Sequence, residues 1–228
     1  MELPESKRGE IIAQLRDKAT LKQKVYDNTF AVMSEIKEIL QEYAVEANET
    51  LEGADRRIRL EYRDRGKLEA QLQLAGDILV FSMHTNTFQF ERDNIVWKNS
   101  YVQRDRNNSY CGIINIYNFL SDSFRFNRQS DEGYLIGRIF VNHESQYFVE
   151  GKRQVSFRHN SFGSGVITYE ALTHIVESAL GYTLEFDLLV PPFDSQKVVS
   201  VEQMNTKIEN SRLQTGKRLG YNYNSDDI

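Results

Sequence analysis

The sequence is poor in cysteine, proline and tryptophan, with one, three and one residue of these types among 228. The single cysteine, Cys111, excludes an intramolecular disulfide bond, and the chain does not open on the cationic and apolar segments of a secretion signal. We therefore expect a cytoplasmic protein, because unpaired thiols are typical of that reducing compartment. Three prolines also leave little room for a proline-rich linker.

Long hydrophobic runs are missing as well. The most apolar stretch, GDILVFSM (76–83), is much shorter than the roughly 18 residues that a membrane-spanning helix needs, and it has the length of a β-strand. The composition, with 40% hydrophobic and 27% charged residues, is ordinary for a globular protein. We therefore expect neither membrane insertion nor general disorder.

The net charge of −5 is unevenly distributed along the chain. Residues 1–55 carry 7 basic and 12 acidic side chains, whereas residues 56–160 carry 16 basic and 12 acidic ones. This basic excess is small for a protein that binds duplex DNA, and the arginines of RDRNNSY (104–110) add little to it. We therefore expect no nucleic-acid partner.

Residues 5–52 are predicted to be helical, because they contain no proline and only one glycine, Gly9. The apolar side chains in the second half follow a 3-4-3-4 spacing: Met33, Ile36, Leu40, Tyr43 and Ala47. A capping box begins at Thr20, so we expect one long helix from about that residue, with Gly53 ending it. Two interpretations stay open, because two heptads are too few to separate them. The apolar stripe packs on the protein's own sheet, or it binds a protein partner or forms a homodimer.

Residues 56–85 give the clearest pattern, since apolar and polar residues alternate strictly in RIRLEYR (57–63) and KLEAQLQL (67–74). Such alternation predicts strands with one buried face, here in a three-stranded antiparallel meander. The apolar face is expected to bury Leu60, Leu72 and Phe81 together.

The turns of this meander suggest a register. A three-residue loop at 64–66 would pair Tyr62 with Leu68, and a two-residue loop at Gly76-Asp77 would pair Leu74 with Leu79. Both pairings keep apolar residues on one face and place a glycine in each turn.

The remaining chain alternates between strand and helix patterns. Strands are predicted where short apolar runs or alternation occur: 87–90, 110–120, 123–128, 132–142 and 182–190. Residues 104–108 are expected to form a polar loop, and helices are expected at 168–181, between Thr168 and Gly181, and at 200–214.

This order of elements predicts an α+β fold with a long N-terminal helix, a mainly antiparallel multi-stranded sheet and two C-terminal helices. We expect three parts. Residues 1–53 form a helical arm, residues 54–214 form the α+β sheet domain, and residues 215–228 form a polar, flexible tail.

Residues 138–160 hold two histidines among several charged residues and invite a search for an active site. A two-residue turn at Glu150-Gly151 predicts a solvated hairpin in which His143 and His159 lie on opposite faces, so they would not share a metal ion. No other histidine, cysteine or carboxylate spacing points to a metal or a cofactor, and Cys111 in its apolar strand is expected to be buried.

The polar face of the meander is the better candidate site. In the register above, Glu61, Glu69 and His84 stand side by side on neighbouring strands. Two close carboxylates raise each other's pKa, and a histidine beside them is held charged, which suits general acid/base chemistry. Together with the neighbouring donor-rich side chains, the same face also suits an anionic or polar ligand. The ligand-binding residues expected from the sequence are Arg59, Glu61, Arg63, Glu69, Gln71 and His84.

Two classes of function follow from these patterns. The first is a non-catalytic assembly or ligand-binding module that uses the helical arm for a partner and the polar sheet face for a small ligand. The second is a hydrolase-like enzyme built on Glu61, Glu69 and His84. The absence of a recognisable catalytic motif favours the first.

Overall fold

The computed structural model describes residues 7–129, 131–185, 188–189, 198, 200–202 and 221–222. Residues 186, 187 and 190 of the expected strand 182–190, most of the expected helix 200–214 and nearly all of the expected tail 215–228 lie outside these residues. Of the described part of that strand, only β8 (Leu188–Leu189) is extended. Residues 182–185 belong to a helix, which ends only at Glu185, so Gly181 does not stop it as expected. That helix, α6 (Tyr169–Glu185), begins as predicted, because the hydroxyl of Thr168 accepts a hydrogen bond from the backbone of Ala171.

The long N-terminal helix is confirmed, but it does not begin at Thr20, because residues 7–19 are helical too and no side-chain cap forms at the start of α2 (Thr20–Thr50). It consists of α1 (Lys7–Gln14), a π-helical turn (Leu15–Ala19) and α2 (Thr20–Thr50), which follow one another without a break. The chain then leaves the helix, and Gly53 has the positive φ of +86° that favours glycine. The seam residues Met33, Ile36 and Leu40 are completely buried against the sheet of the same chain.

A seven-stranded antiparallel sheet forms the body of the protein, in the order β1-β2-β3-β5-β6-β7, with β4 paired to the start of β5. The strands are β1 (Leu60–Asp64), β2 (Glu69–Leu74), β3 (Asp77–Met83), β4 (Phe88–Gln89), β5 (Tyr110–Leu120), β6 (Tyr134–Asn142) and β7 (Tyr147–Gly151). The strand predicted at 110–120 is β5, which lies centrally between β3 and β6. A separate parallel pair joins β8 (Leu188–Leu189) to β9 (Tyr221–Asn222).

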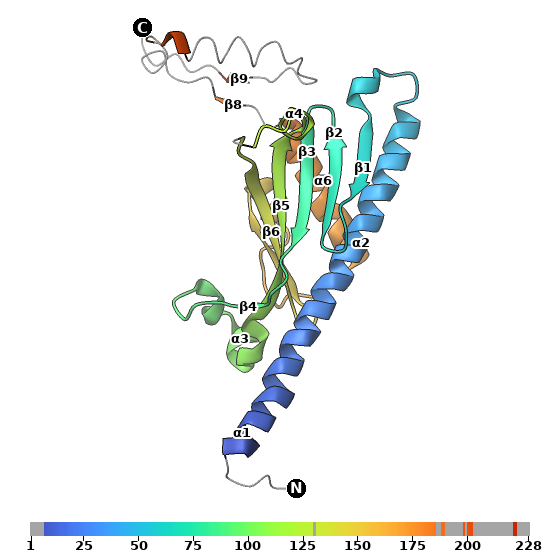
Figure 1. The fold of residues 1–228 in the computed structure, drawn as a ribbon. Coiled ribbons are helices and arrows are strands. Elements are labelled where there is room, and N and C mark those ends of the chain that lie inside the picture. The colour runs from blue at the N-terminus through green and yellow to red at the C-terminus, as the bar shows by residue number, and fades with distance from the viewer. Residues whose placement is uncertain are drawn as a thin grey trace.

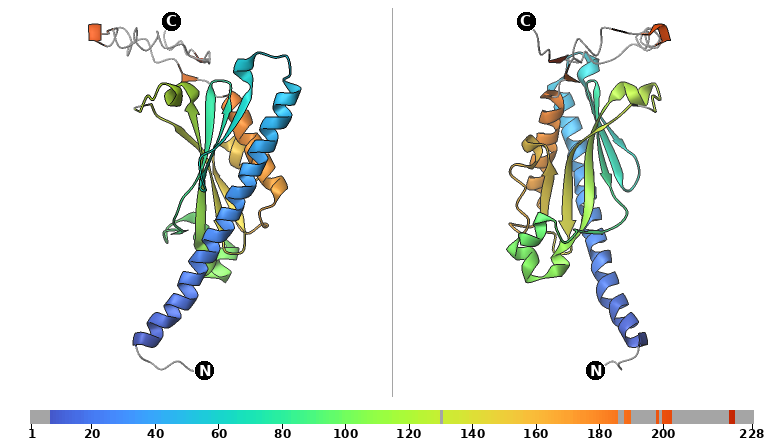
Figure 2. Two further views of the ribbon diagram at one scale, coloured as in Figure 1. Left: turned by 45° about the vertical axis from the view of Figure 1, so that its right-hand side comes forward. Right: turned by 90° about the vertical axis from the view of Figure 1, so that its left-hand side faces the viewer.

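Helices α2 and α6 cover one face of the sheet (Figures 1 and 2), and their apolar sides form the main core with it. Leu72, Phe81, Ile116 and Leu172 are completely buried there. A smaller apolar cluster, which includes Cys111 and Phe140, uses the alternate side chains of β5 and β6 and lies under the segment around α3 (Ser100–Arg104). The α+β architecture expected from the sequence is therefore present.

The meander and its buried face are confirmed, but the predicted register is wrong. Tyr62 pairs with Leu72 instead of Leu68, which is four residues away, and Leu74 pairs with Asp77 instead of Leu79. Both errors are even numbers of residues, so every side chain keeps its predicted face. The second turn uses Ala75 with φ of +51° and Gly76, not Gly76 and Asp77.

Tertiary contacts explain the longer first loop. The ammonium group of Lys37 on α2 contacts the carboxylate of Asp64 at 2.9 Å and also the carbonyl oxygen of Gly66. The same carboxylate accepts a hydrogen bond from the Gly66 backbone at 2.8 Å. These contacts anchor the loop to the helix, so the turn is not decided by its own sequence.

Three other predictions are wrong. Residues 123–128 were expected as a strand, but α4 (Ser121–Arg125) occupies this segment. Residues 104–108 contain the end of α3 and a 3-10 turn (Arg106–Ser109) where a loop was expected. No turn forms at Glu150-Gly151, because β7 pairs with β6 and is followed by the short helix α5 (Arg153–Ser156).

The hairpin turn between β6 and β7 lies instead at residues 143–146. The side-chain oxygen of Asn142 accepts hydrogen bonds from the backbones of Glu144 and Gln146, both at 3.0 Å, and Ser145 adopts φ of +57°. This side-chain turn ends β6 before the glycine at 151 is reached.

Candidate functional site: an arginine-lined cleft

The predicted row of Glu61, Glu69 and His84 does not exist. Glu61 lies opposite Gln73, and Glu69 lies opposite Ser82. His84 follows the end of β3, and its Nδ1 accepts a hydrogen bond from the backbone of Asn86. The four-residue shift of the first hairpin separates Glu61 from Glu69, and the two-residue shift of the second turn separates Glu69 from His84. The three side chains proposed for acid/base catalysis therefore do not stand in one row.

The polar side chains of β1 and β2 form two separate hydrogen-bonded groups. In the first, Arg63 makes two hydrogen bonds of 2.9 Å to the carboxylate of Glu61 and a longer one of 3.4 Å to Gln73. In the second group, the guanidinium group of Arg65 donates a hydrogen bond to the side-chain oxygen of Gln71 at 3.0 Å. The amide nitrogen of Gln71 in turn donates to the carboxylate of Glu69 at 3.1 Å.

The first group borders an open cleft of about 670 Å³, here called the arginine cleft. It lies where the end of α2, strand β1, the turn at Ala75 and helix α4 meet. Six arginines line it: Arg56, Arg57, Arg59, Arg63, Arg65 and Arg125. Its only acidic lining residues are Glu61 and Asp122, so the described walls carry an excess of four positive charges.

Local backbone structure sets the position of these arginines. After Gly53, the carboxylate of Asp55 accepts a hydrogen bond from the backbone of Arg57 and caps a 3-10 turn, Arg56–Ile58. The side chain of Asn48 on α2 then binds both backbone polar groups of Leu60, where β1 begins. The opposite wall is fixed by α4, because the backbone of Ser121 donates to the carbonyl of Gly76 at 2.8 Å.

Ion pairing divides the six arginines into two classes. Arg57 pairs with Asp55, whose carboxyl pKa falls to about 2 because Arg57 donates hydrogen bonds to it, and the hydrogen bonds from Arg63 lower the pKa of Glu61 in the same way. Among the described residues, the guanidinium groups of the other cleft arginines have no carboxylate partner: Arg56, Arg59, Arg65 and Arg125. Arg65 is nevertheless held by Gln71, and Arg125 lies 5.3 Å from the ring of Phe126.

The structure thus brings together three of the six ligand-binding residues expected from the sequence, namely Arg59, Glu61 and Arg63, and leaves Glu69, Gln71 and His84 outside the cleft lining. Sequence reasoning did not select Arg56 and Arg65, although five arginines in ten positions at 56–65 are a visible signal. Arg125 had no such signal, because its segment was interpreted as a strand.

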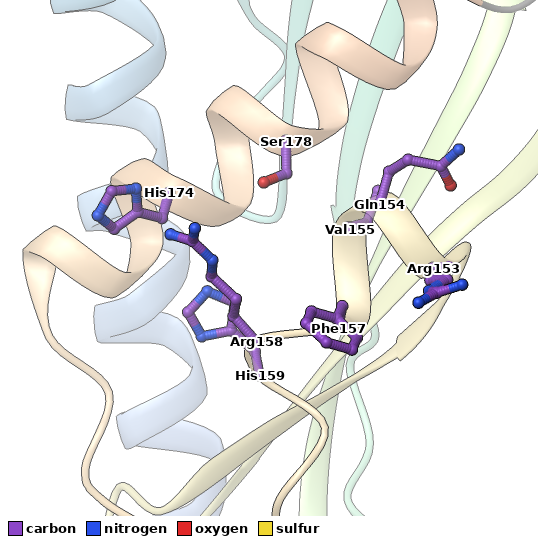
Figure 3. Close-up of a pocket in the computed structure, with 8 residues that line it drawn as sticks. All are labelled: Arg153, Gln154, Val155, Phe157, Arg158, His159, His174 and Ser178. Carbon is purple, nitrogen blue, oxygen red and sulfur yellow. The ribbon is translucent and has the colours of Figure 1, made fainter.

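A second cleft, of about 540 Å³, lies between α5 and α6 and contains His159, His174, Arg158 and Ser178 (Figure 3). The Nδ1 atom of His159 lies 2.8 Å from the hydroxyl of Tyr147. Burial lowers the pKa of His159, with further lowering by His174 and Arg158, so its neutral form is favoured. His143 is in the β6–β7 turn instead, and its backbone carbonyl accepts from Asn28.

The described residues do not support a cysteine nucleophile, a metal site or a membrane-spanning helix. Cys111 is completely buried, and burial raises the pKa of its thiol, which makes it a poor nucleophile. In the described part of the chain, no three histidine, cysteine or carboxylate side chains gather as metal ligands. Within the same residues, no helix is long and apolar enough to span a membrane.

Comparisons with protein-family models, with curated proteins and with solved structures gave no match for this chain. The assignment of function therefore depends on the arginine cleft itself.

Proposed function

We propose that the protein is a non-catalytic cytosolic binding module whose arginine cleft holds a small ligand with two or more anionic groups. The observation that carries this proposal is the excess of six arginines over two carboxylates around one cleft. The cytosolic assignment follows from the lone cysteine, which is a free, buried thiol.

The chemistry of arginine indicates the ligand class. A guanidinium group presents a planar fork of N–H donors that matches a phosphate or a carboxylate in a bidentate manner. Arg56 and Arg59 carry these forks without an acidic partner among the described residues, and both are exposed. Because several arginines surround a cleft whose size is typical of small-molecule sites, a ligand with more than one anionic group would use it best.

Binding without catalysis fits the state of the cleft carboxylates. Arg63 keeps Glu61 ionised and lowers its pKa, so Glu61 is a weak proton donor and a weak base near neutral pH. Asp122 is buried in α4. The alternative hydrolase requires Glu61, Glu69 and His84 in one row, and the strand register gives that arrangement no support.

Isothermal titration calorimetry with inorganic pyrophosphate tests the proposal. We expect Arg59→Gln and Arg56→Gln each to weaken binding by roughly tenfold or more, since a charge-assisted hydrogen bond contributes about 1.5–3 kcal/mol. The matched control is Arg104→Gln, an exposed arginine at the end of α3 that does not line the cleft. Binding should also weaken with added salt.

Three results would contradict the proposal. Unchanged affinity in both cleft variants would show that pyrophosphate binds elsewhere or only through overall charge. Absence of binding by pyrophosphate, citrate and ATP to the wild-type protein would remove the anionic ligand class. Release of phosphate from pyrophosphate or ATP in the same samples would instead make the site catalytic.

A further inference from the structure

The long N-terminal helix has exposed charges that are segregated along its length. Its first part, here called the arm, runs from Lys7 to Lys24 and carries six exposed basic residues, namely Lys7, Arg8, Arg16, Lys18, Lys22 and Lys24. Only Glu10 and Asp17 oppose them, and Asp17 is already bound to Arg16 at 3.0 Å. The arm is therefore a basic rod.

The last part of the same helix, with the two residues that follow it, is acidic. Residues 35–52 carry Glu35, Glu38, Glu42, Glu46, Glu49 and Glu52, and their only basic residue is Lys37. Lys37 is bound to Asp64 of the β1–β2 loop, so it does not offset these carboxylates. Burial and the neighbouring Glu38 raise the pKa of Glu35, as expected where carboxylates crowd.

Exposed apolar side chains accompany both charged parts. Ile11, Ile12 and Leu15 on the arm are 53%, 46% and 62% exposed, and Val45 in the acidic part is 54% exposed. Figure 1 shows the arm projecting past the end of the sheet, so the sheet does not cover it. The π-helical turn Leu15–Ala19 lies within the arm, between its first apolar side chains and the start of α2.

We propose that a second copy of this chain covers these surfaces, with the two N-terminal helices side by side and antiparallel. Both charged parts span about 18 residues, or about 27 Å of helix, so the basic arm of one copy matches the acidic part of the other in length. A pairing centred near residue 30 puts Leu15 opposite Val45 and Arg8 opposite Glu52. A parallel pairing would instead place carboxylates against carboxylates.

The alternative partner of a basic amphipathic arm is an anionic membrane. The structure favours the second copy for two reasons. The arm offers only three exposed apolar side chains, and the acidic part of the same rigid helix would be repelled by an anionic lipid surface. None of the arm residues lines the arginine cleft, and Asn48 is the one cleft residue in the acidic part, so the charged side chains that carry this inference differ from those that carry the proposed ligand site.

Size-exclusion chromatography with light scattering on the full chain tests the dimer. We expect a dimer at a protein concentration of about 100 µM, where weak association is detectable. The dimer should dissociate as the salt concentration is raised, because salt screens exposed charge pairs. Two charge-reversed proteins then provide the decisive comparison. One carries Lys18→Glu, Lys22→Glu and Lys24→Glu, and the other carries Glu38→Lys, Glu46→Lys and Glu49→Lys.

Each reversed protein should be a monomer alone, because it places like charges against like charges. An equimolar mixture should restore a dimer that contains one copy of each. Circular dichroism of the separate proteins identifies a variant that fails to fold, and a single reversal, Lys22→Glu, then replaces the triple one. A wild-type monomer, or a mixture that stays monomeric, would overturn the proposal. If that monomer binds phosphatidylserine vesicles, the partner of the arm is a membrane instead.

Cysteine cross-linking tests the orientation separately. With Leu15→Cys and Val45→Cys in one chain, mild oxidation should give a covalent dimer, since the two positions are about 45 Å apart along one helix and cannot join within a copy. Leu15→Cys alone should give none, because its counterpart in the antiparallel pair is residue 45. Efficient cross-linking of that single variant would indicate a parallel pair and contradict the proposal.

Discussion

The side-chain amide of Asn48 on α2 binds both backbone polar groups of Leu60 on β1, donating to the carbonyl at 2.8 Å and accepting from the N–H at 3.0 Å. This contact connects the end of the helix to the first residue of the edge strand. The same contact holds in place the backbone segment that carries Arg59, Glu61 and Arg63, which line the arginine cleft.

Replacement of Asn48 by alanine should lower the free energy of unfolding by about 1–3 kcal/mol, because a partly buried strand end loses both partners. Urea denaturation measures this loss. Asn86→Ala, which removes an exposed side chain, is the control and should stay within about 0.5 kcal/mol of wild type. Equal stability of the two variants would show that water replaces the Asn48 contacts at no cost.

Leu72→Ala tests the core of the meander. Leu72 is completely buried between the sheet and the helices, so its truncation should cost about 2–5 kcal/mol. Ile95→Ala, at a position that is 77% exposed, serves as the apolar control. A melting temperature of Leu72→Ala within a degree or two of wild type would refute the burial of this face.

The close approach of α2 to the central strand β5 depends on Gly112. A Cβ atom at this position would lie 2.1 Å from the Oγ1 atom of Thr29, which itself donates to the carbonyl of Val25. Gly112→Ala should therefore destabilise the protein by about 1–3 kcal/mol through overpacking. Gly165→Ala, where nothing lies within 4 Å of the added carbon, should leave the urea midpoint nearly unchanged.

His159 should make the stability depend on pH. Its pKa in the folded protein is below the ordinary 6.5, chiefly because of burial, so the unfolded chain takes up the proton first as the pH falls. Its contribution to stability is therefore present above pH 6.5 and is lost as the pH falls through the lower, folded pKa. His159→Gln should reduce the loss of stability between pH 7 and pH 5, and an NMR titration of His159 showing an ordinary or raised pKa would disprove the assignment.

The sequence predicted those features that depend on periodicity. Alternation identified the meander and its buried face, and 3-4 spacing identified the seam of Met33, Ile36 and Leu40. The strand register could not be predicted from the sequence pattern. The length of the first hairpin loop depends on Lys37, a residue of α2 that is 27 positions away from Asp64. The predicted site depends on register, so this error and the two-residue shift of the second turn together dispersed the predicted row.

The same limit explains the other missed features. The α4 segment SFRFNR alternates like a strand, but the backbone of Ser121 binds Gly76 and the chain turns into a helix there. Helix α4 contributes Arg125 to the arginine cleft, so that part of the site was hidden as well. By contrast, the prediction of Arg59 and Arg63 as site residues does not depend on the register. Both belong to the arginine-rich stretch 56–65, whose members are close in space because they are close in sequence.

Burial of the α2 seam against late parts of the chain has a consequence for biosynthesis. The helix is complete in sequence at Thr50, yet it packs on β5, β6 and α6, and Glu42 accepts a hydrogen bond from Tyr169 across 127 positions. At about 5–20 residues per second, a ribosome needs on the order of ten seconds to deliver those partners. Until then the nascent chain presents an amphipathic helix that only the early strands β1, β2 and β3 can cover. Chains stalled near residue 150 should accordingly lose this helix to limited proteolysis, whereas released full-length chains should retain it.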